Sequence, residues 1–430
     1  MKYRTILTLS IILTFSAGIS AETGDSLLTF LGVVDYARQN NLQLSTAKLS
    51  KRSAALDITS ARSALYPTAQ TSFSAGRQFT PVQQNTSGAS VGAALDISPS
   101  RYMAYKAALA GGTSEEYSFK QQERDVVYNV MTQYIRTAGA LKLIEVEQEN
   151  VAYQNLKRDE IAAQVEQGAA SRADLLQQQA NCADAQVRLL QQMQNYERQR
   201  LQLVDNAGLS YGTSYTIDTT DVMRLVTLLT ADSAELHFDS LAEKEEITAQ
   251  RYQLEADKAL LSSSKLGYVP SLSFSGNWSV DGGTADVEPS FRIGGSLTIP
   301  LLDRRQRWLQ VKNAQIRLAS DEVTLDKLKR SNDLSLSQAA LDDALAVDKV
   351  QAAAASAAAA HEALLAMEER YRVGASTFAE LKVVQSASLQ AADNYVQARF
   401  DRTVSRLSVL YETGRIDYVI TLLADGKNRE

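Results

Sequence analysis

Histidine and cysteine, the residues that most often bind metals or act as bases and nucleophiles, are scarce in this chain and lie far apart. The two histidines, His237 and His361, lie far apart in sequence, and a lone histidine more often packs or faces solvent than binds a metal. The single cysteine, Cys182, cannot form an internal disulfide, and the sequence shows no base beside it that would activate a thiolate. No glycine-rich phosphate loop follows a strand. We therefore expect no enzyme activity, no metal site and no cofactor.

Two hydroxyl–carboxylate pairs stand where helices are expected to begin. Ser171 precedes Asp174 by three residues, and Thr377 precedes Glu380 by the same spacing. This spacing is typical of the capping box, with Asp in place of the usual Glu in the first pair. A helix cap contributes about 1 kcal/mol, so each pair predicts a helix that starts directly after a turn.

The sequence repeats itself once. Gly168 and Gly374 stand just before the two capping boxes and fit the left-handed residue that ends a helix. A period of roughly 200 residues is far too long for a solenoid repeat, so it indicates duplication of a whole structural unit. The matching segments are 65–76 with 268–278, 91–99 with 294–302, 165–180 with 371–387, and 206–209 with 412–415.

Each unit is predicted to contain a helix, two strands, a long helix, a tight turn and a further helix. The first unit is 22–206, with helix 26–65, strands 67–79 and 89–98, and helices 101–167 and 171–206. The second unit is 241–412, with helix 241–266, strands 268–280 and 290–300, and helices 303–372 and 377–412. Residues 207–240 link the units, and 413–430 form a C-terminal tail.

The longest predicted helices need neighbours. The helix over 303–372 would be about 105 Å long at 1.5 Å per residue, so we expect it to pack as a coiled coil. The alanine-rich run 351–367 favours either strong helix formation alone or a face where helices approach closely. A column of residues with seven-residue spacing predicts one seam: Leu175, Cys182, Leu189, Tyr196 and Leu203.

The composition and the first residues indicate an exported globular protein. Of its 430 residues, 45% are hydrophobic and 22% are charged, and a net charge of −6 excludes the basic footprint of a nucleic-acid-binding protein. Lys2 and Arg4 precede an apolar run, and small residues follow up to Ala21. This pattern predicts a secretory signal peptide over residues 1–21, because the apolar run is too short for a membrane anchor.

The predicted strands alternate between apolar and polar residues. In SLSFSGNWSV (271–280), Leu272, Phe274 and Trp278 share one face, and serines occupy most of the other. Each strand has about the 9–11 residues that cross a bilayer on a tilt. Two soluble hairpins packed on helices are the alternative, but they would lie at the far end of a long rod, away from any core. Pro67, Pro99, Pro270 and Pro300 mark the helix–strand junctions, where proline stops a helix.

Strands in lipid must close into a barrel, because open sheet edges leave backbone groups without hydrogen bonds. Outer-membrane barrels have at least about 8 strands, and this chain offers four, so it must oligomerise. Two copies would give a barrel whose interior side chains fill, whereas three would leave a conduit. We therefore predict a mainly α protein with a membrane β-barrel built by a trimer.

The duplicated helix–hairpin–helix–helix unit resembles the TolC family of outer-membrane efflux and secretion proteins. The most specific segment is residues 371–414, with Tyr371-x-x-Gly374 followed by Leu381 and Gln385. The resemblance implies a homotrimer with a 12-stranded barrel in outer-membrane lipid and a long helical tunnel in the periplasm. It also implies a periplasmic adaptor protein, an inner-membrane pump that supplies the energy, and an equatorial region formed by 207–240 and 413–430.

The resemblance further implies a gate at the periplasmic tip, in the turns Gly168–Ser171 and Gly374–Thr377. Acidic rings and a tyrosine–aspartate contact close this tip in proteins resembling TolC, and the matching residues here are Asp174, Glu380 and Tyr371. Val383 stands at a further acidic position and Ser376 at an arginine position, so this gate is less charged. Helix capping is the competing role for Asp174 and Glu380, and both roles can coexist.

Two functions remain after these observations. The first is a passive exit duct, as the outer-membrane component of a tripartite efflux pump or of a type I secretion system. The alternative is a structural coiled-coil protein of the periplasm or cell surface without transport activity. The cargo, small molecule or polypeptide, does not follow from the sequence.

Overall fold

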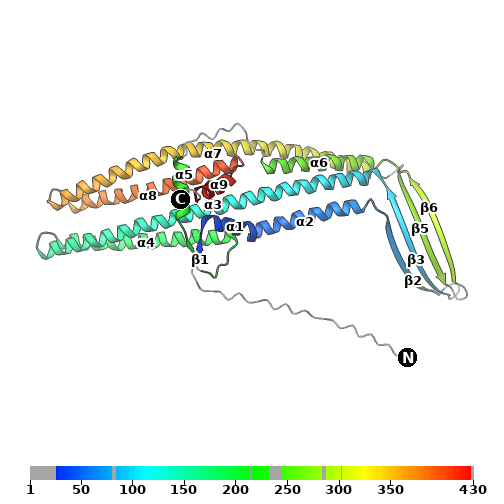
Figure 1. Cartoon of the computed structure of the whole chain (residues 1–430), viewed down its shortest axis with the longest axis horizontal. Coiled ribbons are helices and arrows are strands. Elements are labelled where there is room, and N and C mark those ends of the chain that lie inside the picture. Colours follow the sequence, from blue (N-terminus) through cyan, green and yellow to red (C-terminus); the bar gives the residue numbers. More distant parts are fainter. Residues whose placement is uncertain are drawn as a thin grey trace, which may run out of the picture.

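The chain forms a long rod in the computed structural model (Figure 1). A β-sheet forms one end, two helical hairpins form the tips at the other end, and shorter helices surround the middle. The predicted signal peptide, residues 1–21, and His237 lie outside the described residues. The structure describes residues 26–79, 84–213, 215–231, 244–282, 287–301 and 303–427.

Helices and strands follow one another in a repeated order. The first part contains β1 (Ser26–Leu28), α1 (Phe30–Asn40), α2 (Leu42–Ser63), β2 (Thr68–Gln78), β3 (Gln84–Ile97), α3 (Pro99–Glu166) and α4 (Arg172–Ala207). The connecting part contains β4 (Tyr215–Ile217) and α5 (Thr220–Ala231). The rest contains α6 (Glu245–Leu266), β5 (Ser271–Gly282), β6 (Val287–Thr298), α7 (Gln306–Arg372), α8 (Phe378–Glu412) and α9 (Asp417–Lys427).

The single helix predicted over 26–65 is wrong at its start and at Asn41, where the structure has a short strand and a break between two helices. Residues Ser26–Leu28 pair in parallel with Tyr215–Ile217 as β1 and β4. The helix is then broken at Asn41, which has an extended backbone (φ −61°, ψ 132°). The Asn41 side chain accepts hydrogen bonds from the amides of Gln43 and Leu44 and donates one to the Asn206 carbonyl (2.7 Å). These bonds begin a new helix, and the apolar periodicity does not reveal them.

Two strands are longer at their loop ends than the sequence indicates. The strand predicted over 89–98 begins at Gln84, because β2 continues to pair with it as far as Gln78↔Gln84. The strand predicted over 290–300 begins at Val287 and includes Pro289. Proline within a run argues against a strand, but β6 is an edge strand and tolerates the missing donor.

The four long strands form one antiparallel sheet in the order β2-β3-β5-β6. The hairpins of the two halves meet at β3 and β5, where Val91 pairs with Trp278. Among the strands that the structure describes in one chain, β2 and β6 each have a neighbour on one side only. The sheet therefore has two edges whose backbone groups are available to further strands.

The sheet has one apolar and one polar face. The register places Val91, Trp278 and Phe291 in one row, and their side chains are 51%, 45% and 71% exposed. The next row on the other face consists of serines, with Oγ···Oγ distances of 2.7 Å and 2.8 Å in its two pairs, Ser72–Ser90 and Ser279–Ser290. Half of the surface of this sheet is thus hydrophobic and uncovered in the single chain.

The helices continue the order of the strands. Toward the sheet, α3 packs against α2 and α6, and α6 packs against α7. Toward the tips, α3 packs against α4 and α8, and α8 packs against α7. The helices α2 and α7 are therefore the outer members of their layer, as β2 and β6 are in the sheet.

The largest apolar core lies at the middle of the rod. Phe30 of α1 and Tyr134 of α3 are fully buried, with their rings edge to face at 5.3 Å. The Tyr134 hydroxyl donates toward the carbonyls of Leu28 (2.5 Å) and Asp218 (2.8 Å), beside β1 and β4. Among the helices that the structure describes, none combines the length and the hydropathy that a membrane span requires.

Candidate gate and tunnel wall

The turn between α3 and α4 has the predicted chemistry. Gly168 has a left-handed backbone (φ +73°), and the amide of Ala169 donates to the Gln164 carbonyl at 2.8 Å. The Ser171 hydroxyl accepts from the Asp174 amide (3.1 Å), and the Asp174 carboxylate accepts from the Ser171 amide (3.2 Å). The capping box predicted at this turn is confirmed.

The turn between α7 and α8 repeats this arrangement. Gly374 also has φ +73°, the Thr377 hydroxyl accepts from the Glu380 amide (3.3 Å), and the Glu380 carboxylate accepts from the Thr377 amide (3.0 Å). The second capping box is therefore confirmed. Tyr371 lies at the end of α7, with its ring 6.0 Å from that of Phe378.

The structure brings Asp174 and Tyr371 near each other without joining them. Burial, and then the charge of Asp174, raises the pKa of the Tyr371 hydroxyl. Among the described residues no hydrogen bond links the two, and one oxygen of the Asp174 carboxylate accepts from the amide and hydroxyl of Ser171. Ser376 has a buried hydroxyl without a hydrogen-bond partner in the described part of the chain, and Val383 is 69% exposed.

The four junction prolines stand at the ends of helices and strands. Pro99 is the first residue of α3, where a missing amide costs no hydrogen bond. Pro67 and Pro270 come directly before β2 and β5, and Pro300 follows the end of β6 at Thr298.

Between the tips and the middle of the rod, a tyrosine connects the pair α3–α4 to the pair α7–α8. The sequence analysis did not predict this contact. Tyr153 of α3 donates its hydroxyl hydrogen to Glu368 of α7 and accepts a hydrogen bond from Gln385 of α8 (2.7 Å). Lys157 lies 3.7 Å from the same glutamate. Burial and the Glu368 hydrogen bond raise the pKa of Tyr153, so its hydroxyl stays protonated and remains a donor. No local pattern could reveal this contact, because its members lie 215 and 232 positions apart.

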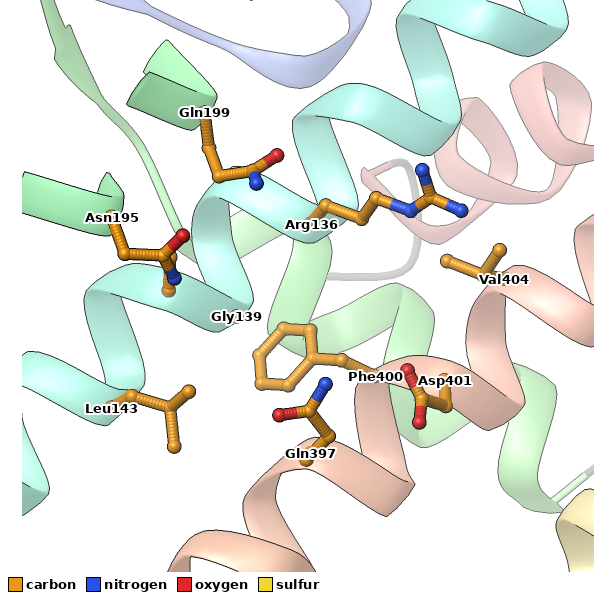
Figure 2. Close-up of a pocket in the computed structure, with 10 residues that line it drawn as sticks. Arg136, Gly139, Leu143, Asn195, Gln199, Gln397, Phe400, Asp401 and Val404 are labelled. Atoms are coloured by element: carbon orange, nitrogen blue, oxygen red, sulfur yellow. The ribbon is translucent and has the colours of Figure 1, made fainter. Parts of the chain in front are cut away.

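A cavity of about 170 Å³ opens nearer the middle of the rod, between α3, α4 and α8. Figure 2 shows Arg136 and Asp401 at one side of it and Asn195 and Gln199 at another. Gly139 allows the close approach of α3 and α8 here, because a Cβ atom at this position would lie 3.1 Å from Cγ of Phe400. The cavity is therefore lined by both polar and apolar side chains.

Within the described part of the chain, no group of three or more His, Cys, Asp or Glu side chains is placed to hold a metal ion.

Comparison with known proteins decides the family. A family model described as outer membrane efflux protein matches residues 33–209 and 238–414. The chain belongs to this family. No curated protein matches the sequence significantly.

Solved structures share the fold of this efflux protein. The Campylobacter jejuni CmeC outer membrane channel aligns over 90% of this chain and 86% of that chain, at 18% identity and a TM-score of 0.79. The Vibrio cholerae outer membrane protein VceC aligns over 90% and 96%, at 14% identity and 0.76. The Neisseria gonorrhoeae MtrE outer membrane channel, in its open state, aligns over 90% and 89%, at 16% identity and 0.75. The TolC-like fold predicted from the sequence is confirmed.

Membership of the family places this efflux protein in the outer membrane with its helical part in the periplasm. The end of the rod that carries the exposed apolar face, at Phe291 for example, is then the end that meets lipid. The two capped turns lie at the opposite end, toward the interior of the cell.

Proposed function

We propose that three copies of this efflux protein form a passive exit duct that crosses the outer membrane and continues into the periplasm. The observation that carries the proposal is the four-stranded sheet, which is apolar on one face and has unpaired edges at β2 and β6. Neither edge is tolerated in lipid, so β6 of one copy pairs with β2 of the next. Three copies supply 12 strands, an even number within the range of outer-membrane barrels.

The outer helices support the same closure. On α2, Leu42, Leu49 and Leu56 recur every seven residues and are 78%, 66% and 64% exposed. On α7, Ile316 and Val323 follow the same spacing and are 68% and 69% exposed. Seven-residue apolar stripes are typical of helices that pack against a partner. In the trimer, α7 of one copy covers α2 of the next, on the same sides where the sheet is open.

In the proposed function, each predicted segment of the chain has its own role. Residues 1–21 direct export, 22–206 and 241–412 are the two repeats, and 207–240 with 413–430 form the equatorial region.

In the proposed tunnel, the two capped turns with Asp174, Tyr371 and Glu380 constrict the periplasmic tip. The chain itself performs no catalysis. An inner-membrane pump, joined through a periplasmic adaptor, drives small molecules or polypeptides through the duct.

Fractionation and electrical recording test the proposal. We expect the protein in the outer-membrane fraction, as a detergent-extracted trimer that dissociates on heating, and we expect stepwise currents when this trimer is added to planar lipid bilayers. A monomeric protein that stays in the aqueous phase after detergent partitioning would overturn the proposal and favour the structural coiled-coil alternative, which no comparison supports.

A further inference from the structure

The polar face of the sheet carries an isolated positive charge at its middle. Arg292 of β6 pairs with Asn277 of β5, and the row continues through Gly92 to Gln70. Arg292 is exposed, and the described residues offer it no ion pair and no hydrogen bond. Its neighbours along β6 on the same face, two residues away on either side, are Ser290 and Gly294.

The nearest acidic residues on this face lie four positions along the strand from Arg292, in both directions. Glu288 stands four positions before Arg292 on the same face of β6 and pairs with Asp281 of β5, and Asp96 lies in the row of Ser296, four positions after Arg292. Four residues of strand span about 13 Å, beyond the ~8 Å over which physiological salt leaves charges unscreened. Asp96 is also paired with Arg101 at 3.1 Å, so it does not neutralise the row.

We infer that Arg292 forms an anion-attracting ring inside the membrane part of the duct and selects for negatively charged solutes. The inference rests on the proposed trimer, in which the apolar face meets lipid and the polar face lines the lumen. Three copies then place three guanidinium groups at one height, in a row that contains no acidic residue. Rings of arginine or lysine are the means by which pores favour anions, and a channel wall focuses their field. The solutes concerned carry carboxylate, sulfonate or phosphate groups.

A thiol placed beside Arg292 reports the local potential directly. In a Cys182→Ser background, Asn277→Cys introduces a thiol on the strand opposite Arg292. Its rates of reaction with an anionic reagent (sulfonatoethyl methanethiosulfonate) and a cationic one (trimethylammonioethyl methanethiosulfonate) are measured on the assembled trimer from the loop side. The ratio of the two rates cancels any effect on the thiol's own ionisation, and the state of the periplasmic tip does not enter.

We expect the anionic-to-cationic rate ratio to fall at least about threefold in Arg292→Gln, because the attraction of the anionic reagent is lost. Arg292→Lys should keep most of the ratio. Arg77→Gln is the matched control: it removes the same charge from the same sheet, but Arg77 shares the apolar face with Phe73. This variant should leave the ratio unchanged.

Salt provides a second measurement that needs no substitution of the arginine. With Arg292 present, the ratio should approach that of Arg292→Gln as salt rises from 0.1 M to 1 M, because the Debye length falls from about 10 Å to 3 Å. Equal ratios with and without the arginine, or no salt dependence, would overturn the ring while leaving the duct intact. If Trp278→Cys reacts with both reagents and Asn277→Cys reacts with neither, the faces are reversed and the proposed duct itself is wrong.

Discussion

Single residues in the tunnel wall combine burial with charge. Glu147 of α3 is 2% exposed, accepts a hydrogen bond from Asn150 (3.0 Å) and lies 3.7 Å from Arg188 of α4. Asp393 of α8 has a buried carboxylate oxygen without a hydrogen-bond partner in the described residues. Burial, and then the charge of Glu147, raises the pKa of Asp393 to about 6, although Arg188 acts in the opposite direction. Two carboxylates from different helix pairs thus compete for one guanidinium group.

Replacing Asp393 by Asn should stabilise the protein near neutral pH. Folding raises the pKa of Asp393. The contribution of this group to the free energy of unfolding is therefore fully present below pH 3.8 and is lost as the pH rises through about 6. At pH 7.5 the variant should gain about 1–2 kcal/mol, after a discount for the solvent around this half-buried group, and at pH 4 it should match the wild type.

Thermal unfolding between pH 4 and 8 measures the difference. Asp401→Asn is the control, since Asp401 is partly exposed and pairs with Lys349 at 2.9 Å. An equal stabilisation by Asp393→Asn at every pH would show that the effect does not arise from ionisation.

The proposed gate gives a second prediction for a single residue. Removing the hydroxyl in Tyr371→Phe should increase single-channel conductance in planar bilayers, because a latch to Asp174 in the closed trimer would lose about 1 kcal/mol per subunit. Tyr418→Phe, at an exposed tyrosine of α9, should leave conductance unchanged. Unchanged conductance in Tyr371→Phe would count against the latch.

Chemistry within a few residues was predictable, and chemistry between distant residues was not. The Ser171–Asp174 box follows from four consecutive residues, so its hydrogen bonds could be anticipated. The Tyr153 contact requires knowing which faces of α3, α7 and α8 meet, and that depends on tertiary packing. The same holds for Asp393, whose neighbours come from two other helices.

Four helices of this protein, α1, α2, α4 and α8, begin where a side chain caps the backbone. The break between α1 and α2 shows this most clearly, since Asn41 is 6% exposed and bonds both to its own helix and to the end of α4. Polar residues on both faces of Gln84–Ser87 likewise hid the start of β3 from the alternation pattern. Apolar periodicity locates the middle of an element, and local hydrogen bonds set its ends.

Asn41→Ala should destabilise the protein by about 1–3 kcal/mol, because it removes the cap of α2 and leaves the Asn206 carbonyl without its donor. Denaturant unfolding measures the change. The adjacent Asn40→Ala serves as the control, since Asn40 is exposed and, among the described residues, its side chain bonds only within α1, to the Tyr36 carbonyl. Equal losses in both variants would contradict the capping role.

A single copy of the molecule leaves two of its sides open, and in the proposed trimer it is one third of the assembly. The strands β2 and β6 and the helices α2 and α7 lie on its two open sides, with their apolar side chains uncovered. The sequence already indicated that four strands cannot close alone. It did not indicate that the hairpins of the two repeats pair with each other, because that contact joins β3 to β5 across roughly 180 residues.

Leu49→Glu should prevent trimer formation without unfolding the chain. Leu49 is 66% exposed in the single chain, so a charge there costs little until α7 of a neighbour buries it. Size-exclusion chromatography with light scattering in detergent measures the assembly, and circular dichroism measures the helix content. Leu49→Met retains the apolar volume and should still assemble. A stable Leu49→Glu trimer would place the subunit contact elsewhere.

The two unpaired strand edges have a consequence for biogenesis. A newly exported subunit crosses the periplasm with unpaired backbone groups along β2 and β6. Any extended peptide can form hydrogen bonds with these strands. Closure of the trimer and aggregation into fibres therefore use the same backbone groups, and the two processes compete for the same unassembled subunits. Periplasmic chaperones that hold such subunits apart until they reach lipid would favour the first outcome, and overproduction would favour the second.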